Sequence, residues 1–218
     1  MYYTRPSGDF SRPGRTWYPT GGKTSFPIWG EVSIAYHEGV PGHHFQIGTS
    51  VYLSETLSRY QRQLGGTSGY VEGWALYAER LMGELGYLEN PDYYMGMLRA
   101  QALRSVRVIL DIGMHLKLQI PQDSDFHPDQ LWTPELGLAF IETKSHFPKH
   151  FVASEIDRYL GLPGQAISYK VGEKVWLETR ESAKKKAGEK FNLKDWHTKA
   201  LNLVPMGLSQ MRRELLKI

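Results

Sequence analysis

Apolar residues recur at helical spacing along most of the chain after residue 30. Between Tyr70 and Leu85, for example, Trp74, Tyr77 and Leu81 follow one another at intervals of three or four residues and share a helix face. Proline and glycine residues separate such stretches and mark helix ends. The pattern predicts helices over residues 31–38, 43–63, 70–85, 91–118, 134–143, 165–187, 193–201 and 208–216.

The first 30 residues follow a different pattern. Proline, glycine and aromatic residues dominate there, as in residues 12–15 and 18–22. Such residues form turns and extended segments rather than helices, and one short strand is expected near residues 15–18. We therefore expect a mainly α fold, in which an irregular or β lead-in of residues 1–30 precedes a helical domain of residues 31–218.

The composition fits one sizeable core or two small ones. Of the 218 residues, 41% are hydrophobic and 22% are charged, whereas a disordered chain is poorer in apolar residues. The net charge is only +3 and the one basic cluster, at residues 184–186, ends a predicted helix, so no nucleic-acid partner is expected. No apolar run reaches the roughly 18 residues of a membrane helix. No signal peptide is recognised, and cytoplasmic and periplasmic locations both stay open.

The segment from His37 to His44 carries the most informative chemistry. It contains no cysteine, nor does the rest of the chain, so any metal must be held by His, Asp or Glu. A His-Glu pair followed by another His indicates a zinc hydrolase, in which two imidazoles bind the metal and the Glu deprotonates a water molecule. The usual spacing is His-Glu-x-x-His, but here the later histidines stand six and seven residues after the first.

A regular helix does not bring these histidines together. His43 would point roughly 120° away from His37, and His44 would lie about 10.5 Å along the axis. Pro41 and Gly42 interrupt the helix, and a broken turn would return His43 to His37. The metal hypothesis therefore requires a distorted turn, and the alternative is a kinked helix with a histidine pair at the surface.

Two carboxylates on a later predicted helix are the candidates for the third ligand. Glu72 lies in the first turn of the helix at 70–85, and Glu79 follows seven residues later on the same face. One of them can bind the metal while the other holds a ligand histidine. The apolar neighbours of these residues favour burial over a solvated face, and buried carboxylates need partners.

A polar stripe on the predicted helix 91–118 adds further candidates. Arg104, Arg107, Asp111 and His115 are spaced by three, four and four residues and share one face. In a functional site His115 would stabilise an oxyanion and Asp111 would orient it. A salt-bridged surface stripe is the equally weighted alternative.

The segment from Arg158 to Lys170 places a loop at a helix N-terminus, which is a natural anion site. Tyr169 would donate a hydrogen bond to a tetrahedral intermediate, and Arg158 would hold a peptide carboxylate. Arg107 and Lys170 are further candidates for substrate binding. Ordinary helix packing is the simpler explanation for each residue.

Together these motifs resemble the bacterial family named domain of unknown function 885, which is grouped with zinc metallopeptidases. The resemblance extends over nearly the whole chain, and a more distant similarity leads to thimet-oligopeptidase-like and carboxypeptidase-Taq-like enzymes. It rests on His37-Glu38-x-x-Pro41-Gly42-His43-His44-x-Gln46, Glu72-Gly73-Trp74-Ala75-Leu76-Tyr77-Ala78-Glu79, Arg104-x-x-Arg107-x-x-x-Asp111-x-Gly113-x-His115, Arg158-Tyr159 and Pro163-Gly164-Gln165-Ala166-x-Ser168-Tyr169-Lys170.

The resemblance implies a role for each candidate. One zinc ion would be bound by His37, His43 and Glu72, with Glu38 as general base. His115 and Tyr169 would face the substrate. The ligands would be supported by Glu79, Asp111 and His44.

The resemblance also implies an architecture, the catalytic half of a zincin-like metallopeptidase. Peptide hydrolysis is inferred from the zinc site, and a cleft walled by helices favours short peptides. Family members are typically more than twice as long, and their N-terminal helical half is the expected partner across the cleft. The opening segment fits the middle of such a domain better than its start. The alternatives are a non-catalytic helical metal-binding module, a fragment that lacks the other cleft wall, a metal-free helical domain, and a hydrolase of other amides or esters.

Overall fold

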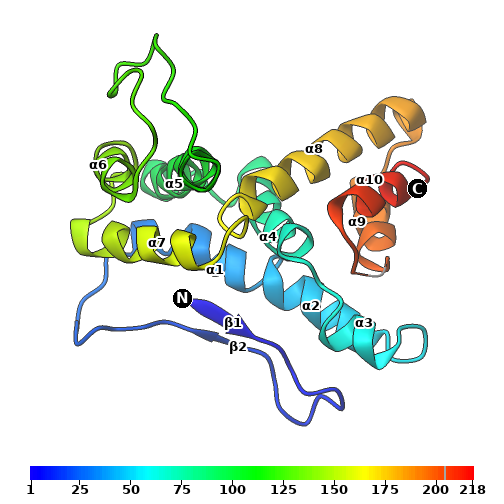
Figure 1. The fold of residues 1–218 in the computed structure, drawn as a ribbon. Coiled ribbons are helices and arrows are strands. Elements are labelled where there is room, and N and C mark those ends of the chain that lie inside the picture. Colours follow the sequence, from blue (N-terminus) through cyan, green and yellow to red (C-terminus); the bar gives the residue numbers. More distant parts are fainter. Residues whose placement is uncertain (204) are drawn as a thin grey trace.

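The computed structural model describes residues 1–203 and 205–218 and is mainly helical, as predicted (Figure 1). Two short strands precede the helices, which confirms the expected β segment at the start. The elements in chain order are β1 (Tyr2–Thr4), β2 (Arg15–Trp17), η1 (Ile28–Gly30), α1 (Val32–Glu38), α2 (His43–Tyr52), α3 (Arg59–Gln63), α4 (Ser68–Glu84), α5 (Pro91–His115), α6 (Pro134–Lys144), α7 (Lys149–Gly161), α8 (Ser168–Ala187), η2 (Gly188–Lys190), α9 (Leu193–Leu201) and α10 (Leu208–Leu215).

Three elements differ from the sequence prediction. Helix α7 was not predicted, although its buried residues Val152, Ile156 and Tyr159 follow the helical period. The helix expected at 43–63 is two helices, because Ser58 forms a capping box that starts α3 anew. Strand β2 was expected, but its antiparallel partner β1 was not.

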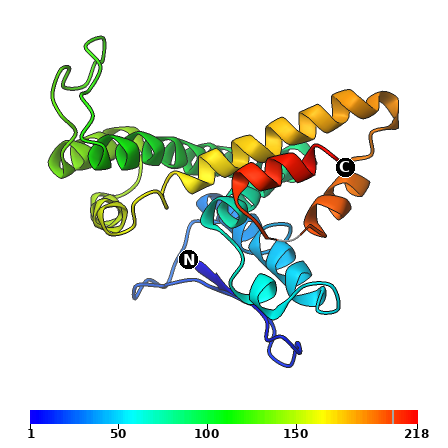
Figure 2. The ribbon, with the colours of Figure 1, turned by 45° about the vertical axis from the view of Figure 1, so that its right-hand side comes forward.

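The apolar side chains form two separate clusters. Figure 1 shows α5, α6 and α7 gathered at one end of the molecule and α8, α9 and α10 at the other, and Figure 2 keeps the same separation. The first cluster joins α4, α8, α9 and α10 and includes Tyr70, Trp74, Tyr77, Trp176, Trp196, Met211 and Leu215. The second joins α5, α6, α7 and the segment between α5 and α6, and includes Leu103, Leu110, Trp132, Ile141, Ile156 and Tyr159.

Helices α4 and α8 cross at two glycines. A Cβ atom added to Gly73 would lie 2.5 Å from the backbone of Gly172, and one added to Gly172 would lie 2.2 Å from the carbonyl oxygen of Gly69. Any side chain at the crossing would push the helices apart, so glycine sets their separation. The crossing brings Glu72 of α4 and Tyr169 of α8 into the same region. Among the helices of the described residues, none combines the length and the apolar character of a membrane-spanning segment.

Candidate metal centre

The turn between α1 and α2 breaks the helix so that two histidines meet. A Cβ atom on Gly42 would lie 1.9 Å from the carbonyl oxygen of His37, a distance that leaves room only for glycine. The indole of Trp74 donates a hydrogen bond to the carbonyl oxygen of Pro41, at 2.8 Å, and fastens the turn to α4. The distortion that the metal hypothesis requires is therefore present, and His43 opens α2 beside the end of α1.

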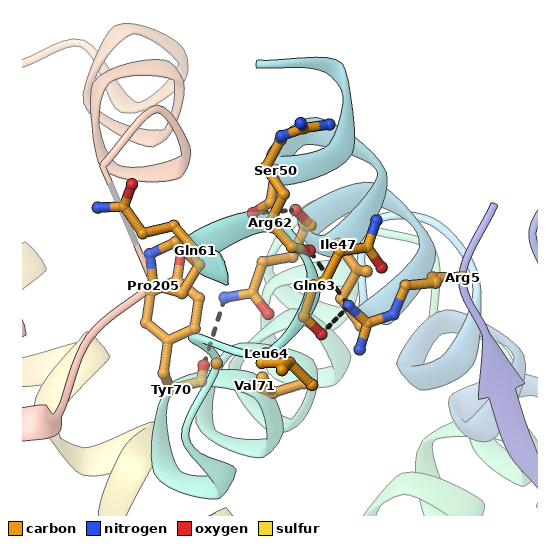
Figure 3. A pocket seen from close by; sticks show the side chains of 12 residues that line it. Arg5, Ile47, Ser50, Gln61, Arg62, Gln63, Leu64, Tyr70, Val71 and Pro205 are labelled. Atoms are coloured by element: carbon orange, nitrogen blue, oxygen red, sulfur yellow. Dashed lines mark hydrogen bonds between the residues drawn. The ribbon is translucent and has the colours of Figure 1, made fainter. Parts of the chain in front are cut away.

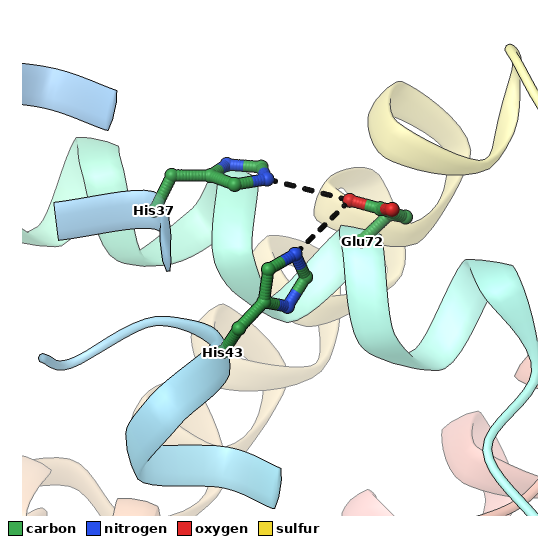
Figure 4. A group of neighbouring side chains, drawn as sticks. All are labelled: His37, His43 and Glu72. Carbon is green, nitrogen blue, oxygen red and sulfur yellow. Dashed lines mark ion pairs between the residues drawn. The ribbon is translucent and has the colours of Figure 1, made fainter. Parts of the chain in front are cut away.

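The two imidazoles point toward a single carboxylate oxygen (Figure 4). The Nε2 atom of His37 lies 3.3 Å and that of His43 3.4 Å from the Oε2 atom of Glu72. The rings of the two histidines are nearly perpendicular, with centroids 4.8 Å apart. One donor atom from each of the three side chains lies within 4.8 Å of the others. The sequence prediction of His37, His43 and Glu72 as one group matches this geometry.

Glu79 fixes the orientation of His37. Its Oε1 atom lies 2.7 Å from Nδ1 of His37, and its Oε2 atom accepts a hydrogen bond from the hydroxyl of Ser33. The Glu79 side chain is fully buried. A carboxylate at Nδ1 leaves Nε2 directed at Glu72, as in metal sites where an outer carboxylate orients a ligand histidine. This resolves the two acidic candidates of α4: Glu72 completes the cluster and Glu79 supports it.

Electrostatics at this point favour a positive charge. Burial is the largest single influence and lowers the pKa of His37, but Glu72 and Glu79 together raise that pKa to about 10. Burial raises the pKa of Glu72, yet the neighbouring imidazoles of His37 and His43 hold it well below its usual range. Two carboxylates beside two imidazoles thus create a buried position that suits either a proton or a cation.

The three side chains of the cluster offer donor atoms of the kind that a divalent metal binds. Two imidazole nitrogens and one carboxylate oxygen form the donor set of catalytic zinc sites, in which a fourth position stays open. The Oε2 atom of Glu72 and the Nδ1 atom of His43 are buried without a hydrogen-bond partner among the described residues. A cation would satisfy the carboxylate oxygen, whereas the second imidazole lacks the outer partner that Glu79 gives the first.

Glu38, the predicted general base, ends α1 next to His37. It is 7% exposed, and its Oε2 atom is buried without a hydrogen-bond partner among the described residues. Glu38 is thus a buried carboxylate with a free oxygen, the form that a proton acceptor needs. Its charge also acts on the N-terminal segment: burial, followed by the charges of Glu31 and Glu38, raises the pKa of Tyr18.

Tyr169 connects the cluster to a group of arginines. Its ring stacks on His37 with centroids 6.1 Å apart, and its hydroxyl accepts a hydrogen bond from Nη2 of Arg158 at 3.1 Å. The guanidinium carbons of Arg104 and Arg107 lie 5.2 Å and 4.8 Å from the centre of the same ring. The structure therefore brings Arg107, Arg158 and Tyr169 together, and Tyr169 borders the histidine pair.

His115 and Asp111 are engaged elsewhere. The Nε2 atom of His115 lies 2.9 Å from the carbonyl oxygen of Tyr159 and 3.3 Å from Oδ1 of Asp111. The same carboxylate oxygen accepts a hydrogen bond from the backbone of Gly164. The predicted orientation of His115 by Asp111 is thus present, but both side chains link α5 to α7 and to the loop before α8.

Two further candidates have partners outside the cluster. The Nδ1 atom of His44 lies 2.9 Å from the hydroxyl of Tyr3, so this imidazole contacts β1 rather than Glu72. The ammonium group of Lys170 donates to Gln101 and, at 2.8 Å, to Glu173. The support predicted from His44 therefore acts on the N-terminal strands, and the charge of Lys170 is already paired.

Two residues of this region were missing from the sequence prediction. Ser33 holds Glu79, but a lone serine in a helix gives no signal of such a role. Glu155 pairs with Arg107 and Arg158, and its pKa is lowered because those charges outweigh its burial. Its spacing of three residues from Arg158 was a usable signal once α7 is recognised.

A separate cavity of about 230 Å³ lies between α2, α3 and the start of α4 (Figure 3). Arg5 reaches into its wall and donates a hydrogen bond to the carbonyl oxygen of Arg62 at 3.1 Å. The lining also includes Gln46 and Tyr70, but none of the three clustered side chains. The hydrogen bond of Arg5 ties the end of β1 to α3.

Comparison with known proteins places the chain in a family. The family of bacterial proteins of unknown function named DUF885 matches residues 1–215. The chain belongs to DUF885. Comparison of this DUF885 chain with curated proteins gives no significant match.

Two solved structures resemble this DUF885 chain. A candidate lipoprotein from Colwellia psychrerythraea is 34% identical, with a TM-score of 0.83 over 99% of the chain. A candidate lipoprotein of unknown function from Shewanella oneidensis is 23% identical, with a TM-score of 0.76 over 99% of the chain, and shows similarity of fold. The chain spans 35% and 38% of the length of these two proteins.

Proposed function

We propose that this DUF885 chain carries the catalytic metal site of a zincin-like hydrolase whose substrates are short peptides. The observation that supports the proposal most is the approach of two Nε2 atoms, of His37 and His43, to one oxygen of Glu72 at 3.3 Å and 3.4 Å. The bond from Glu79 to the far side of the His37 ring adds to it. The two contacts hold the His37 ring with Nε2 directed at Glu72, the orientation that a ligand histidine needs.

The ligands would be His37, His43 and Glu72, and one zinc ion is the expected cofactor. Zinc bound by such a set supplies Lewis acidity and lowers the pKa of a water ligand towards about 7. Glu38 has the free, buried oxygen needed to accept a proton from water and to hand it to the leaving amine. Tyr169 lies against His37 and offers a hydroxyl that can stabilise negative charge on a substrate oxygen.

Metal analysis of the full chain together with a peptide library tests the proposal. We expect about one zinc per chain by mass spectrometry of the metal, and cleavage of library peptides. Glu38→Gln should retain zinc and lose hydrolysis, because only the proton acceptor is changed. Glu72→Gln should lose both. Glu55→Gln, at an exposed position in the turn after α2, is the matched control and should keep both.

The other outcomes select among the alternatives. A chain that holds one zinc but cleaves no peptide is a metal-binding module, or it requires the further part that its longer relatives possess. A chain with far less than one zinc after zinc loading refutes the metal site itself. Cleavage of amides or esters other than peptides would keep the metal site and change the substrate.

A further inference from the structure

The ring of Tyr169 is surrounded by more positive charge than the fold neutralises. The guanidinium groups of Arg104, Arg107 and Arg158 all reach this ring, from α5 and α7. Glu155 is the one carboxylate paired with them among the described residues: it accepts from Arg107 and lies 3.4 Å from Nη1 of Arg158. Three cations against one anion leave an excess of two positive charges.

This excess is held in a largely desolvated place. Arg107 is 3% exposed and Arg104 is 9% exposed. The Nη1 atom of Arg107 and the Nε atom of Arg104 are buried without a hydrogen-bond partner among the described residues. Burial of charged N–H groups without partners is costly, and natural proteins accept that cost mainly where a ligand or a catalytic task requires it.

Arg158 is the member of this group that reaches solvent, and its Nη2 atom donates to two uncharged groups, the side-chain oxygen of Gln165 and the hydroxyl of Tyr169. The side chain of Arg158 is 34% exposed and that of Glu72 is 18% exposed. Between them stands Tyr169, whose ring stacks on His37 and whose hydroxyl contacts Arg158. A small anion at Arg158 would therefore lie one aromatic ring away from the histidine pair.

We propose that Arg158, backed by the charges of Arg107 and Arg104, binds the C-terminal carboxylate of the peptide substrate, an inference that rests on the proposed peptidase function. Guanidinium groups pair with planar carboxylates through parallel hydrogen bonds, which gives them an advantage over lysine at such a position. The subsite makes the chain selective for peptides that end close to the scissile bond. Its action is that of a carboxypeptidase-type exopeptidase.

Binding measurements on the full chain test the subsite without requiring turnover. The probes are the N-acetylated tripeptide Ala-Ala-Phe with a free C-terminus, the same peptide as a C-terminal amide, and an amidated N-acetyl tripeptide ending in Asp. Calorimetric titrations are run with zinc-free chain and again with added zinc. We expect the free acid to bind at least tenfold tighter than the amide in both states. The amide ending in Asp should bind like the plain amide if the terminal carboxylate is the group recognised.

Variants at one position sharpen the test. Arg158→Gln should reduce the preference for the acid to near unity, and Arg158→Lys should keep an intermediate preference because charge remains while the fork is lost. Arg212→Gln, at an exposed arginine of α10 that pairs with Glu178, is the control and should keep the full preference. Circular dichroism melting of each variant establishes that it is folded, and the lysine variant keeps the comparison informative if the glutamine variant is not.

The outcomes separate this inference from the proposed function. Equal binding of acid and amide, or no binding of the acid, overturns the subsite even when zinc-loaded chain cleaves peptides. Tenfold preference for the acid without any cleavage supports the subsite and counts against the peptidase. Displacement of the acid by inorganic phosphate at a lower concentration than by acetate would show a phosphate site and overturn the carboxylate assignment.

Discussion

From the close crossing of α4 and α8 we predict how much Gly73→Ala lowers the free energy of unfolding. An added Cβ atom would lie 2.5 Å from the backbone of Gly172, whereas carbon atoms in contact are about 3.5–4.0 Å apart. The helices must therefore separate by about 1 Å or more at this point, and no side-chain rotation can absorb the shift because the added methyl group meets only backbone atoms of Gly172 and Glu173. The separation loosens the packing of Trp74 against Trp176, whose ring centroids are 4.9 Å apart.

The expected loss of stability follows from two opposing effects. Alanine in place of glycine inside a helix contributes about 1 kcal/mol. Overpacking at a rigid contact costs typically 1–3 kcal/mol and more where backbone must move. We expect a net decrease of about 2 kcal/mol in the free energy of unfolding, which lowers the melting temperature of a chain of this size by roughly 4–8 °C.

Urea unfolding followed by circular dichroism measures the change. Gly48→Ala is the matched control, because Gly48 lies inside α2 and an added Cβ atom meets nothing within 4 Å. It should be stabilising by about 0.5–1 kcal/mol. A Gly73→Ala variant that is as stable as the Gly48→Ala variant would refute the close approach of α4 and α8.

Two further predictions concern charge and protonation. Glu79→Gln should lower the zinc affinity of the proposed site by about 10–100-fold while the chain stays folded, because the amide keeps the shape but removes the charge that supports His37. A competition titration with a zinc chelator measures this affinity. Unchanged affinity would contradict the supporting role of Glu79. His197 has its pKa lowered to about 4, first by burial and then by Arg180, and its Nε2 atom lies 2.7 Å from the hydroxyl of Tyr77. A histidine kept neutral by the fold makes the folded state less stable as pH falls from about 6.5 towards 4, because the unfolded chain takes up the proton first. Urea midpoints across this range should show that loss in the unaltered chain and less of it in His197→Gln; identical profiles would contradict the assignment.

The meeting of His37, His43 and Glu72 was predictable because the segments involved are local or strongly patterned. Pro41 and Gly42 indicated a broken turn, and the structure shows that position 42 has no room for a side chain. Glu72 and Glu79 were marked by their apolar neighbours on one helix. The choice between them, however, depends on where α4 passes α1, which no pattern within α4 encodes.

Other contacts escaped prediction because they join distant segments. Strand β1 is three residues long, and its pairing with β2 follows from tertiary contacts rather than from a periodic pattern. The partner of His44 is Tyr3, which stands 41 residues earlier. Helix α7 is a different case, because the spacing of Val152, Ile156 and Tyr159 follows the helical period within the segment itself.

Because the apolar side chains form two separate clusters, the region around Tyr169 joins two independently packed ends of the molecule. Tyr169 belongs to α8, which is anchored at the α9–α10 end, whereas Arg107 and Arg158 are anchored at the α6 end. A small rotation of one end against the other would lengthen the contacts between the tyrosine and the arginines while both interiors stay packed. The contacts between Tyr169 and the arginines therefore lie where the two packed ends of the molecule meet.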